Sequence, residues 1–331
     1  MPEALGVRIA GTGSAIPSRV LDNAHFVRYL DTSDEWIRER TGIRERRVVG
    51  ESESTVTLAV EASRRALEDA GLSAADLDLI VVATITPECP FPATACYVQH
   101  ALGAREIATY DLHAACTGFI YALVTTIQML QSGSYRHVLV IGAETLSRIT
   151  DYEDRTSCIL FGDGAGAMVL SPGPRERGPR LLNWHLHSDG SGANMLWVPA
   201  GGSRLPTSHM TVNERLHYMK MQGREVYKFA VKKMLEMVEQ TLDEVGIRPE
   251  QLAMVIPHQS NRRIIESARE RLGLTEEKMF INIDRLGNTS AASIPIAFDE
   301  VRRSGGIRPG DYVLLVAFGA GLTWASALLE V

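Results

Sequence analysis

An internal repeat is the feature that most restricts how this chain can fold. A shift of 175 positions takes residues 66–72 (ALEDAGL) to residues 241–247 (TLDEVGI), and it also takes residues 137–140 (HVLV) to residues 312–315 (YVLL). The same shift of 175 positions therefore relates two separated pairs of segments, so the repeat extends over a whole half of the chain. The simplest physical account is two similar α/β halves packed together, with strand ends meeting in a shared crevice where ligands of open α/β sheets bind.

Helix and strand signals alternate along the chain, as expected for an α/β fold. An amphipathic helix is predicted over residues 55–70, ending at Gly71, and is followed by an apolar run over residues 77–85 that is typical of a strand covered on both faces. Further strands are predicted over residues 7–11, 107–112, 137–142, 158–170, 312–317 and 322–329. Residues 11–17 (GTGSAIP) are interpreted as a turn, because Pro17 and a missing third glycine argue against a dinucleotide-binding loop.

A break in composition marks the predicted boundary between the halves. Pro172, Gly173 and Pro174, with Gly178 and Pro179 just beyond, favour a linker, which divides the chain into residues 1–172 and 173–331. Residues 188–220 are rich in glycine, proline, serine and threonine. A loop of that length is typically a lid or a pocket wall.

Charge and cysteine content exclude several functional classes. The formal net charge of −6 argues against general nucleic-acid binding, which needs a basic surface. Four cysteines without a CxxC pair indicate free thiols in a reducing compartment, and no zinc site or other cofactor is expected. The first residues show no signal peptide, so a cytoplasmic protein is predicted.

One uncharged segment, residues 312–329, approaches the length of a membrane span. Its centre contains Gly319 and Gly321, which fit a turn between two strands better than the interior of a helix. The hairpin is therefore favoured over the membrane span, and no membrane association is expected.

Cys116 is placed where the strand over residues 107–112 gives way to a helical run over residues 117–131. The positive end of a helix lowers a thiol pKa, and an unpaired backbone N–H there can receive an oxyanion, so Cys116 is a candidate nucleophile. The helix is apolar almost all round, which predicts burial. The alternative is that Cys116 is simply a small buried core residue.

Two further groups are predicted to gather near Cys116. The repeat register puts His258 where the first half has Ala83, at the end of a strand, and it sets Ala291, close to Asn288, opposite Cys116. A thiol with a nearby imidazole and carboxamide suits acyl transfer through a covalent thioester. Taken singly, His258 can be a core histidine and Asn288 a turn or N-cap residue.

Trp36 and Arg40 form another candidate pair. Residues 32–35 (TSDE) have the form of a capping box, so a short helix should begin there and bring Trp36 and Arg40 onto one face. A tryptophan beside an arginine can stack a flat ring and meet a phosphate. A packed tryptophan beside a solvated arginine is the alternative.

Six ordered motifs give the chain a resemblance to the β-ketoacyl-acyl carrier protein synthase III family, which has the thiolase-like fold. The resemblance runs from Val7 to the end of the chain. The motifs are Thr32-Ser33-Asp34-Glu35-Trp36-Ile37, Ala114-Ala115-Cys116-Thr117-Gly118-Phe119, Phe161-Gly162-Asp163-Gly164-Ala165-Gly166, Pro257-His258-Gln259-Ser260-Asn261, Gly287-Asn288-Thr289-Ser290-Ala291-Ala292-Ser293 and Phe318-Gly319-Ala320-Gly321-Leu322-Thr323-Trp324. The resemblance implies two pseudo-duplicated α/β halves in a layered αβαβα core.

The resemblance implies a condensing acyltransferase of fatty-acid biosynthesis. Cys116 would take an acyl group from acyl-CoA, with the oxyanion held by the N–H groups of Cys116 and Ala320. Malonyl-acyl carrier protein would then bind, and His258 and Asn288 would hydrogen-bond its thioester oxygen while carbon dioxide leaves. The resulting carbanion would attack the Cys116 thioester.

The resemblance also implies the substrate contacts and a homodimer. Trp36 and Arg155 would enclose the adenine of CoA, Arg40 would lie near its phosphate, and Asn261 would contact the pantetheine. The residues implied for the acyl pocket are Phe91, lent by a partner subunit, and Leu146, Leu160, Phe161 and Met221. Arg262 and Arg263, with Arg269 and Arg271, would receive the acidic carrier protein, although a solvated charged face is the alternative.

Departures from the family pattern leave the primer open. His113, Thr117 and Ala320 stand where the family mostly has other residues, so acetyl, branched or longer primers, or a specialised pathway, all remain as alternatives. A Cys-His-Asn thioester hydrolase would use the same three residue types, but it would give no reason for Trp36, Arg40 and Arg155. Elongating condensing enzymes use two histidines, and a non-catalytic acyl-CoA-binding protein would not need all three reactive groups.

Overall fold

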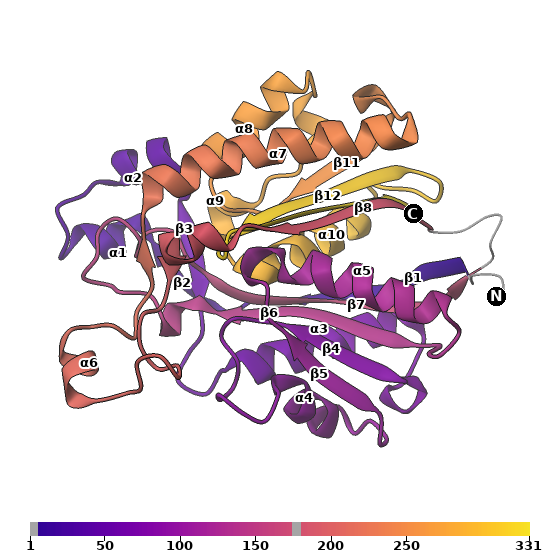
Figure 1. Ribbon diagram of the computed structural model, residues 1–331, viewed down its shortest axis with the longest axis horizontal. Coiled ribbons are helices and arrows are strands. Elements are labelled where there is room, and N and C mark those ends of the chain that lie inside the picture. Colours follow the sequence, from indigo (N-terminus) through magenta and orange to yellow (C-terminus); the bar gives the residue numbers. More distant parts are fainter. Residues whose placement is uncertain (1–5, 174–179) are drawn as a thin grey trace.

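The core of the protein is built from two large sheets and three layers of helices, as the computed structural model shows (Figure 1). The structure describes residues 6–173 and 180–331. The first residues of the chain and most of the predicted linker, residues 174–179, lie outside the described part. The layers follow one another as helices, sheet, helices, sheet and helices, which confirms the predicted αβαβα core.

The first sheet has five strands in the order β1-β7-β6-β4-β5. β4 is parallel to β5 and β6, whereas β7 is antiparallel to both β6 and β1. The strand bounds are β1 (Gly6–Ala15), β4 (Leu79–Ala83), β5 (Ala108–Leu112), β6 (Val138–Thr145) and β7 (Asp163–Gly173).

The second sheet repeats this topology in the order β8-β13-β12-β11. β11 and β12 are parallel, and β13 is antiparallel to both β12 and β8, so β11, β12, β13 and β8 correspond to β4, β6, β7 and β1. An isolated bridge between Val255 and Met279 stands beside β11, where β5 pairs with β4 in the first sheet. The strand bounds are β8 (Arg180–Ser188), β11 (Leu252–Pro257), β12 (Tyr312–Gly319) and β13 (Thr323–Glu330).

The helices form the outer and central layers. α3 (Thr55–Ala70) and α4 (Thr94–Leu102) cover the outside of the first sheet, while α7 (Gly223–Val245) and α8 (Arg262–Arg271) cover the second (Figure 1). α5 (Gly118–Gln131) and α10 (Ser293–Arg303) lie between the sheets. One hydrophobic core joins the halves there, including Phe119 and Leu123 from α5 and Phe298 from α10.

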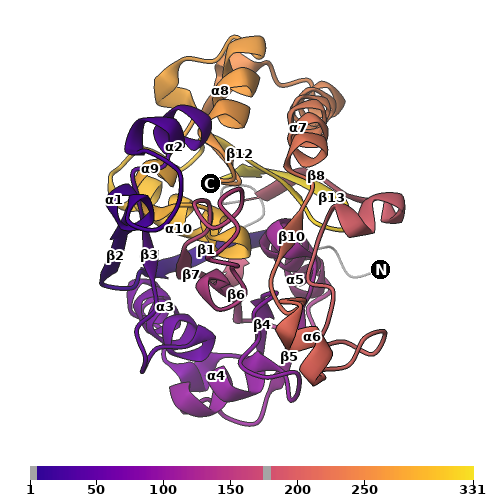
Figure 2. The same ribbon diagram turned by 90° about the vertical axis from the view of Figure 1, so that its left-hand side faces the viewer.

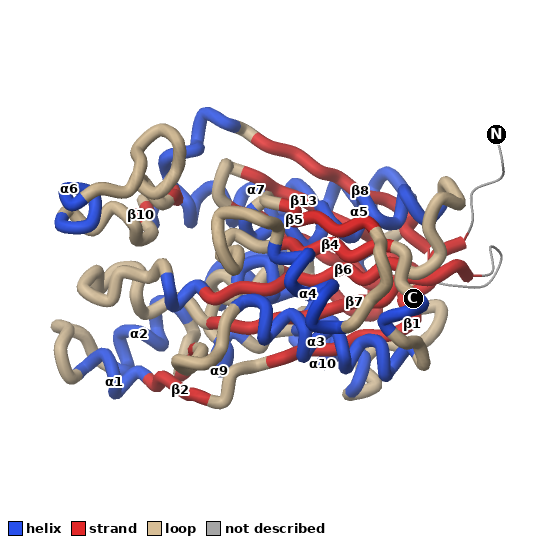
Figure 3. Tube along the Cα trace, turned by 90° about the horizontal axis from the view of Figure 1, so that it is seen from below, coloured by secondary structure: helices blue, strands red, loops and turns tan. Residues whose placement is uncertain are grey.

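Short elements gather at one end of the molecule, on the left of Figure 1 and facing the viewer in Figure 2. They include α1 (Asn23–Val27) with α2 (Asp34–Thr41), the two-stranded antiparallel sheet of β2 (Arg19–Asp22) and β3 (Glu45–Val48), and α9 (Ile283–Leu286). The predicted loop over residues 188–220 contributes β9 (Leu196–Trp197), α6 (His209–Asn213) and the first residue of β10 (Lys220–Met221). Figure 3 shows α6, α1 and α2 at the same end from below.

Two local predictions are wrong. Residues 11–15 continue β1 and are not a turn. Gly11 and Gly13 are needed there because α3 packs directly on the strand: a Cβ on Gly11 would lie 2.5 Å from the Ala70 nitrogen, and one on Gly13 would lie 2.5 Å from the Ala66 nitrogen. The strand predicted from residue 158 begins only at Asp163.

The glycine-rich segment of β7 fits the predicted close backbone approach. A Cβ on Gly166 would lie 2.6 Å from the Ile296 nitrogen in α10. The uncharged segment over residues 312–329 forms β12 and most of β13, as predicted. Among the described residues, no helix combines the length and the apolar composition that crossing a bilayer requires.

Candidate active site

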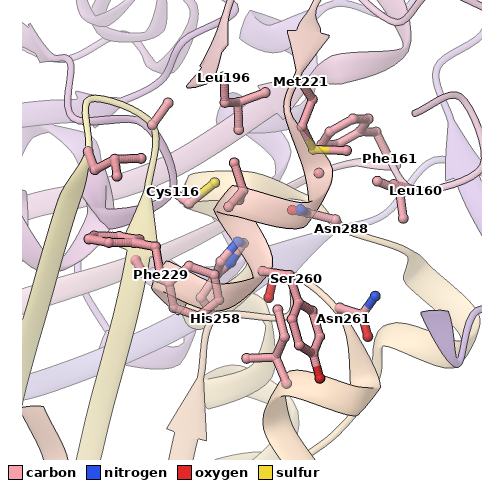
Figure 4. Close-up of a pocket in the computed structure, with 18 residues that line it drawn as sticks. Cys116, Leu160, Phe161, Leu196, Met221, Phe229, His258, Ser260, Asn261 and Asn288 are labelled. Carbon is pink, nitrogen blue, oxygen red and sulfur yellow. The ribbon is translucent and has the colours of Figure 1, made fainter. Parts of the chain in front are cut away.

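Cys116, His258 and Asn288 line one pocket of about 100 Å³. Figure 4 shows the three side chains around the same space, although they come from distant parts of the sequence. Cys116 precedes α5, His258 follows β11, and Asn288 lies between α9 and α10. The two-halves arrangement therefore brings together the three groups that the sequence singled out.

Cys116 lies in a single 3₁₀ turn, Ala115–Thr117, directly before α5. The preceding residue, Ala115, has a φ of 47°, in the left-handed region that alanine seldom adopts. The thiol is buried, and burial raises its pKa to about 12. The expected lowering by the helix end is therefore wrong in direction, because the loss of solvent outweighs it.

His258 is held as a neutral imidazole. It is 1% exposed, and burial lowers its pKa to about 3. Nδ1 lies 2.8 Å from Ser293 Oγ, which in turn lies 3.5 Å from the Gln259 N–H. The Ser293 hydroxyl can accept from the Gln259 N–H and still donate its own hydrogen to Nδ1. In that tautomer Nε2 carries the ring hydrogen and is a hydrogen-bond donor.

Asn288 has its amide oriented by the backbone two residues further on. Its Oδ1 accepts a hydrogen bond of 2.8 Å from the Ser290 N–H, which leaves Nδ2 available as a donor. Its own N–H donates to the Leu160 carbonyl at 2.8 Å, and its carbonyl accepts from Gly162 at 3.0 Å. Two neutral donors, one from His258 and one from Asn288, are thus offered to a single pocket.

Cys116 also lines a second cavity of about 450 Å³. Apolar side chains such as Leu146, Ile149 and Val198 contribute to its wall. Among the predicted acyl-pocket residues, Leu146 lines this second cavity, Leu160 and Met221 line the pocket with His258, and Phe161 lines both. Phe91 lines neither and is 84% exposed, so the same chain does not bring it to Cys116.

The turn after β12 closes over the cysteine. Ala320 lines both cavities beside Cys116. A Cβ on Gly319 would lie only 2.8 Å from the Cys116 nitrogen, so glycine at that position permits a close backbone approach. The predicted pair of oxyanion donors, Cys116 and Ala320, is therefore in the same part of the pocket.

Trp36 is part of α2, and its ring faces Arg40 of the same helix and Arg155 of a distant segment. The Arg40 guanidinium carbon is 4.6 Å from the ring centroid of Trp36, and that of Arg155 is 5.2 Å from it. A ring inserted between two planes needs about 7 Å, two contacts of about 3.5 Å each, so Arg155 would have to move outward to admit an adenine. Arg155 is otherwise bound to Asp31, whose carbonyl accepts from it at 2.6 Å.

Asn261 and the following arginines lie at the start of α8. Asn261 lines the pocket with His258, and its Nδ2 donates to the Arg40 carbonyl at 2.9 Å. Arg262 pairs with Glu266 at 2.6 Å, and the Arg263 guanidinium lies 5.7 Å from the Tyr227 ring centroid. The surface there mixes both signs of charge and includes Glu35 and Glu39 beside the arginines.

Several residues at this site are not identified by local sequence motifs. Glu144, near the end of β6, is fully buried close to Cys116, and Ser290 and Ser293 hold polar contacts around Asn288 and His258. A single acidic residue inside the apolar run over residues 138–146 was the available signal for Glu144. The two serines lie in a motif in which only the asparagine was considered.

Comparison with known families gives two matches within the chain. The C-terminal region of the family described as 3-Oxoacyl-[acyl-carrier-protein (ACP)] synthase III matches residues 242–331, and a second region of that family matches residues 110–190. The β-ketoacyl-[acyl-carrier-protein] synthase III of Caldanaerobacter subterraneus subsp. tengcongensis is 53% identical over 330 residues, which cover 100% of this chain and 99% of that protein.

Solved structures agree with these matches. The crystal structure of 3-oxoacyl-[acyl-carrier-protein] synthase III from Aquifex aeolicus VF5 is similar with a TM-score of 0.90 and 44% identity, covering 98% of this chain and 100% of that one. The priming β-ketosynthase from the R1128 polyketide biosynthetic pathway is similar with a TM-score of 0.90 and 35% identity, covering 99% of this chain and 97% of that one.

Proposed function

The chain belongs to the 3-oxoacyl-[acyl-carrier-protein] synthase III family, and on that premise we propose that it condenses an acyl-CoA primer with malonyl-acyl carrier protein to begin fatty-acid biosynthesis. One observation carries this proposal. Cys116 lines both the pocket that holds His258 and Asn288 and the larger apolar cavity. An acyl chain on its sulfur can lie in the cavity while a second thioester reaches the two donors.

In the first half-reaction, the Cys116 thiolate attacks the thioester carbon of acyl-CoA and coenzyme A leaves as a thiolate. The developing oxyanion is stabilised by the backbone N–H groups of Cys116 and Ala320. The covalent intermediate is an acyl-Cys116 thioester. No metal or other cofactor takes part in this chemistry.

In the second half-reaction, His258 and Asn288 bind the thioester oxygen of the malonyl group. Their Nε2–H and Nδ2–H stabilise the enolate that forms when carbon dioxide leaves, and the neutral state of His258 makes it a donor without a positive charge. The enolate carbon then attacks the acyl-Cys116 carbonyl. The products are a β-ketoacyl-carrier protein and the Cys116 thiolate.

The substrate contacts follow from the surroundings of the pocket. We assign Trp36, Arg40 and Arg155 to the nucleotide of CoA, and Asn261 to its pantetheine. We assign Leu146, Leu160, Phe161 and Met221 to the acyl pocket.

The partners follow from the surface. Arg262 and Arg263 would meet an acidic carrier protein, and their position on α8 between Asn261 and Ile264, which line the pocket, supports this assignment. Phe91, which is 84% exposed, would enter the acyl pocket of a second copy, so a homodimer is the assembly we propose. The halves 1–172 and 173–331 are the two units that together build each site.

A priming role in a specialised pathway is the second candidate, because the R1128 priming β-ketosynthase shares 35% identity over nearly the whole chain. A Cys-His-Asn thioester hydrolase is a third alternative. Incubation with acetyl-CoA and malonyl-carrier protein, followed by mass analysis of the carrier protein, separates synthase from hydrolase. A β-ketoacyl-carrier protein supports the proposed function, whereas free acid without a new carbon–carbon bond contradicts it.

A further inference from the structure

Glu144 is a buried carboxyl group beside the nucleophile that the proposed chemistry leaves without a role. It is 0% exposed, and it accepts hydrogen bonds from Thr86 Oγ1 at 2.6 Å, from the Ile85 N–H at 3.1 Å and from Thr84 Oγ1 at 3.3 Å. These donors come from the segment directly after β4, and none of them carries a charge. Burying a carboxylate without a cation costs folding free energy, so a carboxyl group with a purely structural role would destabilise the protein here.

Ser290 links the surroundings of Glu144 and Cys116. It lines the larger cavity together with Cys116, its hydroxyl lowers the pKa of both the Glu144 carboxyl and the Cys116 thiol, and its backbone N–H orients Asn288. The residue is 1% exposed, and its Oγ makes no hydrogen bond of standard geometry with any group in the described ranges 6–173 and 180–331. A buried hydroxyl without a hydrogen-bond partner is uncommon in a folded protein, which leaves the Ser290 hydroxyl available to a neighbouring group.

The thiol needs a proton acceptor, because only a thiolate attacks a thioester efficiently. Burial raises the pKa of Cys116 to about 12, and burial lowers the pKa of His258 to about 3. Burial raises the pKa of Glu144 to about 7, although the Thr86 hydroxyl and the Ile85 N–H act against this rise. Glu144 is therefore the better proton acceptor of these two buried groups.

The groups that face Glu144 leave few competitors for that proton. From the segment after β4 it meets Thr84, Thr86 and the Ile85 N–H, and from the turn before α10 it meets Ser290. Cys116, from the turn before α5, is the titratable group whose pKa its charge affects. The polar chain from sulfur to hydroxyl to carboxyl thus joins both halves of the molecule.

We propose that Glu144 accepts the proton of the Cys116 thiol through the Ser290 hydroxyl during acyl transfer and returns it at the end of the cycle. The inference rests on the proposed function. Ser290 passes its hydroxyl proton to the Glu144 carboxylate and takes the thiol proton, so that Cys116 becomes the attacking thiolate. Coenzyme A leaves as a thiolate and is protonated by water. After condensation, the Cys116 thiolate recovers its proton from Glu144 by the same path.

Glu144 acts here through Ser290 and does not touch the substrate, so its test must go beyond loss of activity. The rate of acyl-Cys116 formation from acetyl-CoA is measured by rapid quench and intact mass between about pH 5.5 and 9. In the wild type the rate should rise with pH through a midpoint near the pKa of Glu144, about 7. Glu144→Gln should lose this rise and acylate at least about tenfold more slowly above the midpoint.

Thr86→Val gives a directional test. The Thr86 hydroxyl stabilises the ionised carboxylate and so lowers the Glu144 pKa, and its removal should move the midpoint of acylation to higher pH with the plateau retained. Thr84→Val is the matched control, because its hydrogen bond is longer, 3.3 Å against 2.6 Å, and its shift should be smaller. If Thr86→Val and Thr84→Val both kept the acylation midpoint of the wild type, this would contradict a role for the ionisation of Glu144.

A competing role makes the opposite prediction. If Glu144 were only a negative charge that raises the pKa of Cys116, Glu144→Gln would lower that pKa and would acylate faster. Faster or unchanged acylation therefore overturns the relay. Ser290→Ala keeps the backbone N–H that holds Asn288 and should show the same lost pH dependence, which gives a second test if Glu144→Gln does not fold. Failure of the wild type itself to acylate would instead overturn the proposed function.

Discussion

Ala115 and Ser290 occupy equivalent positions of the two halves and share one unusual backbone conformation, with φ values of 47° and 48°. The shift of 175 positions that relates the halves in sequence also relates these residues. Each is the first residue of a 3₁₀ turn that precedes a central helix, α5 or α10. The duplicated fold thus supplies two equivalent turns, one presenting Cys116 and the other fixing Asn288.

The conformation of Ala115 leads to a first prediction. Ala115→Gly should retain acylation, because glycine adopts positive φ without steric cost, whereas Ala115→Val should reduce it at least about tenfold by displacing Cys116. Ala114→Val is the control: it adds the same bulk to the wall of the same cavity at a residue whose φ is negative, −143°. Equal losses in both valine variants would show that bulk, and not backbone conformation, is responsible. Acyl-enzyme formation is followed by intact mass.

The neutral donor role of His258 leads to a second prediction. His258→Ala should retain the acyl adduct on Cys116 but should slow decarboxylation of malonyl-carrier protein by about 10² or more, because one of two enolate donors is lost. Release of labelled carbon dioxide measures the effect. His100→Ala, at an exposed position near the end of α4, is the control that should behave as the wild type. Unchanged release in His258→Ala would remove His258 from this step.

Burial of His258 makes the folding stability depend on pH. The pKa is 6.5 for an ordinary histidine and about 3 in the folded protein, so between these values the unfolded chain binds a proton that the folded protein does not. The contribution of His258 to the free energy of unfolding is complete above pH 6.5 and is lost as the pH falls, by about 1.4 kcal/mol per pH unit. Glu144, whose pKa rises from 4.5 to about 7, acts in the opposite direction and loses its contribution as the pH rises through that window.

His258→Gln isolates the contribution of His258 to the pH dependence of the free energy of unfolding, because Glu144 is unchanged in this variant. The free energy of unfolding of the wild type relative to this variant should fall by about 1.4 kcal/mol for each pH unit of acidification between about 6.5 and 4.5. Urea unfolding at fixed protein concentration measures the difference. A constant difference over this range would mean that His258 titrates normally in the folded protein.

The aromatic ring of Trp36 leads to a prediction about the nucleotide. Trp36→Ala should raise KM for acetyl-CoA about tenfold, the effect of losing one stacking partner, and should leave KM for acetyl-pantetheine nearly unchanged. Trp184→Ala, an exposed tryptophan on β8, is the matched control that should raise neither. Equal rises for both substrates in Trp36→Ala would place Trp36 outside the nucleotide site.

Much of the fold follows from patterns that a sequence carries directly. α3 was predicted over residues 55–70 with Gly71 after it, because apolar periodicity and a left-handed glycine mark its course, and Gly71 indeed has a φ of 64°. The repeat predicts that His258 lies at the end of a strand and faces the crevice, and His258 indeed follows β11 and lines the pocket. The helix depends on local sequence signals, and the position of His258 depends on the alignment of the two halves by the repeat.

The errors concern contacts between segments distant in sequence. Gly11 and Gly13 resemble turn residues until α3 is known to lie against them. The pKa of Cys116 is raised because several elements bury the thiol, and a local sequence pattern does not indicate that burial. Glu144 and Ser290 meet only because β6 and the turn before α10 pack together, so neither was identified from sequence.

Covalent acylation of Cys116 is the central step, and intact mass after mixing with acetyl-CoA tests it most directly. The wild type should gain one acetyl group, Cys116→Ser should gain none, and Cys158→Ser should behave as the wild type, because Cys158 is also a buried thiol with a pKa of about 12 but lies outside the pocket. Absence of the adduct from the wild type, or its persistence in Cys116→Ser, would contradict the account.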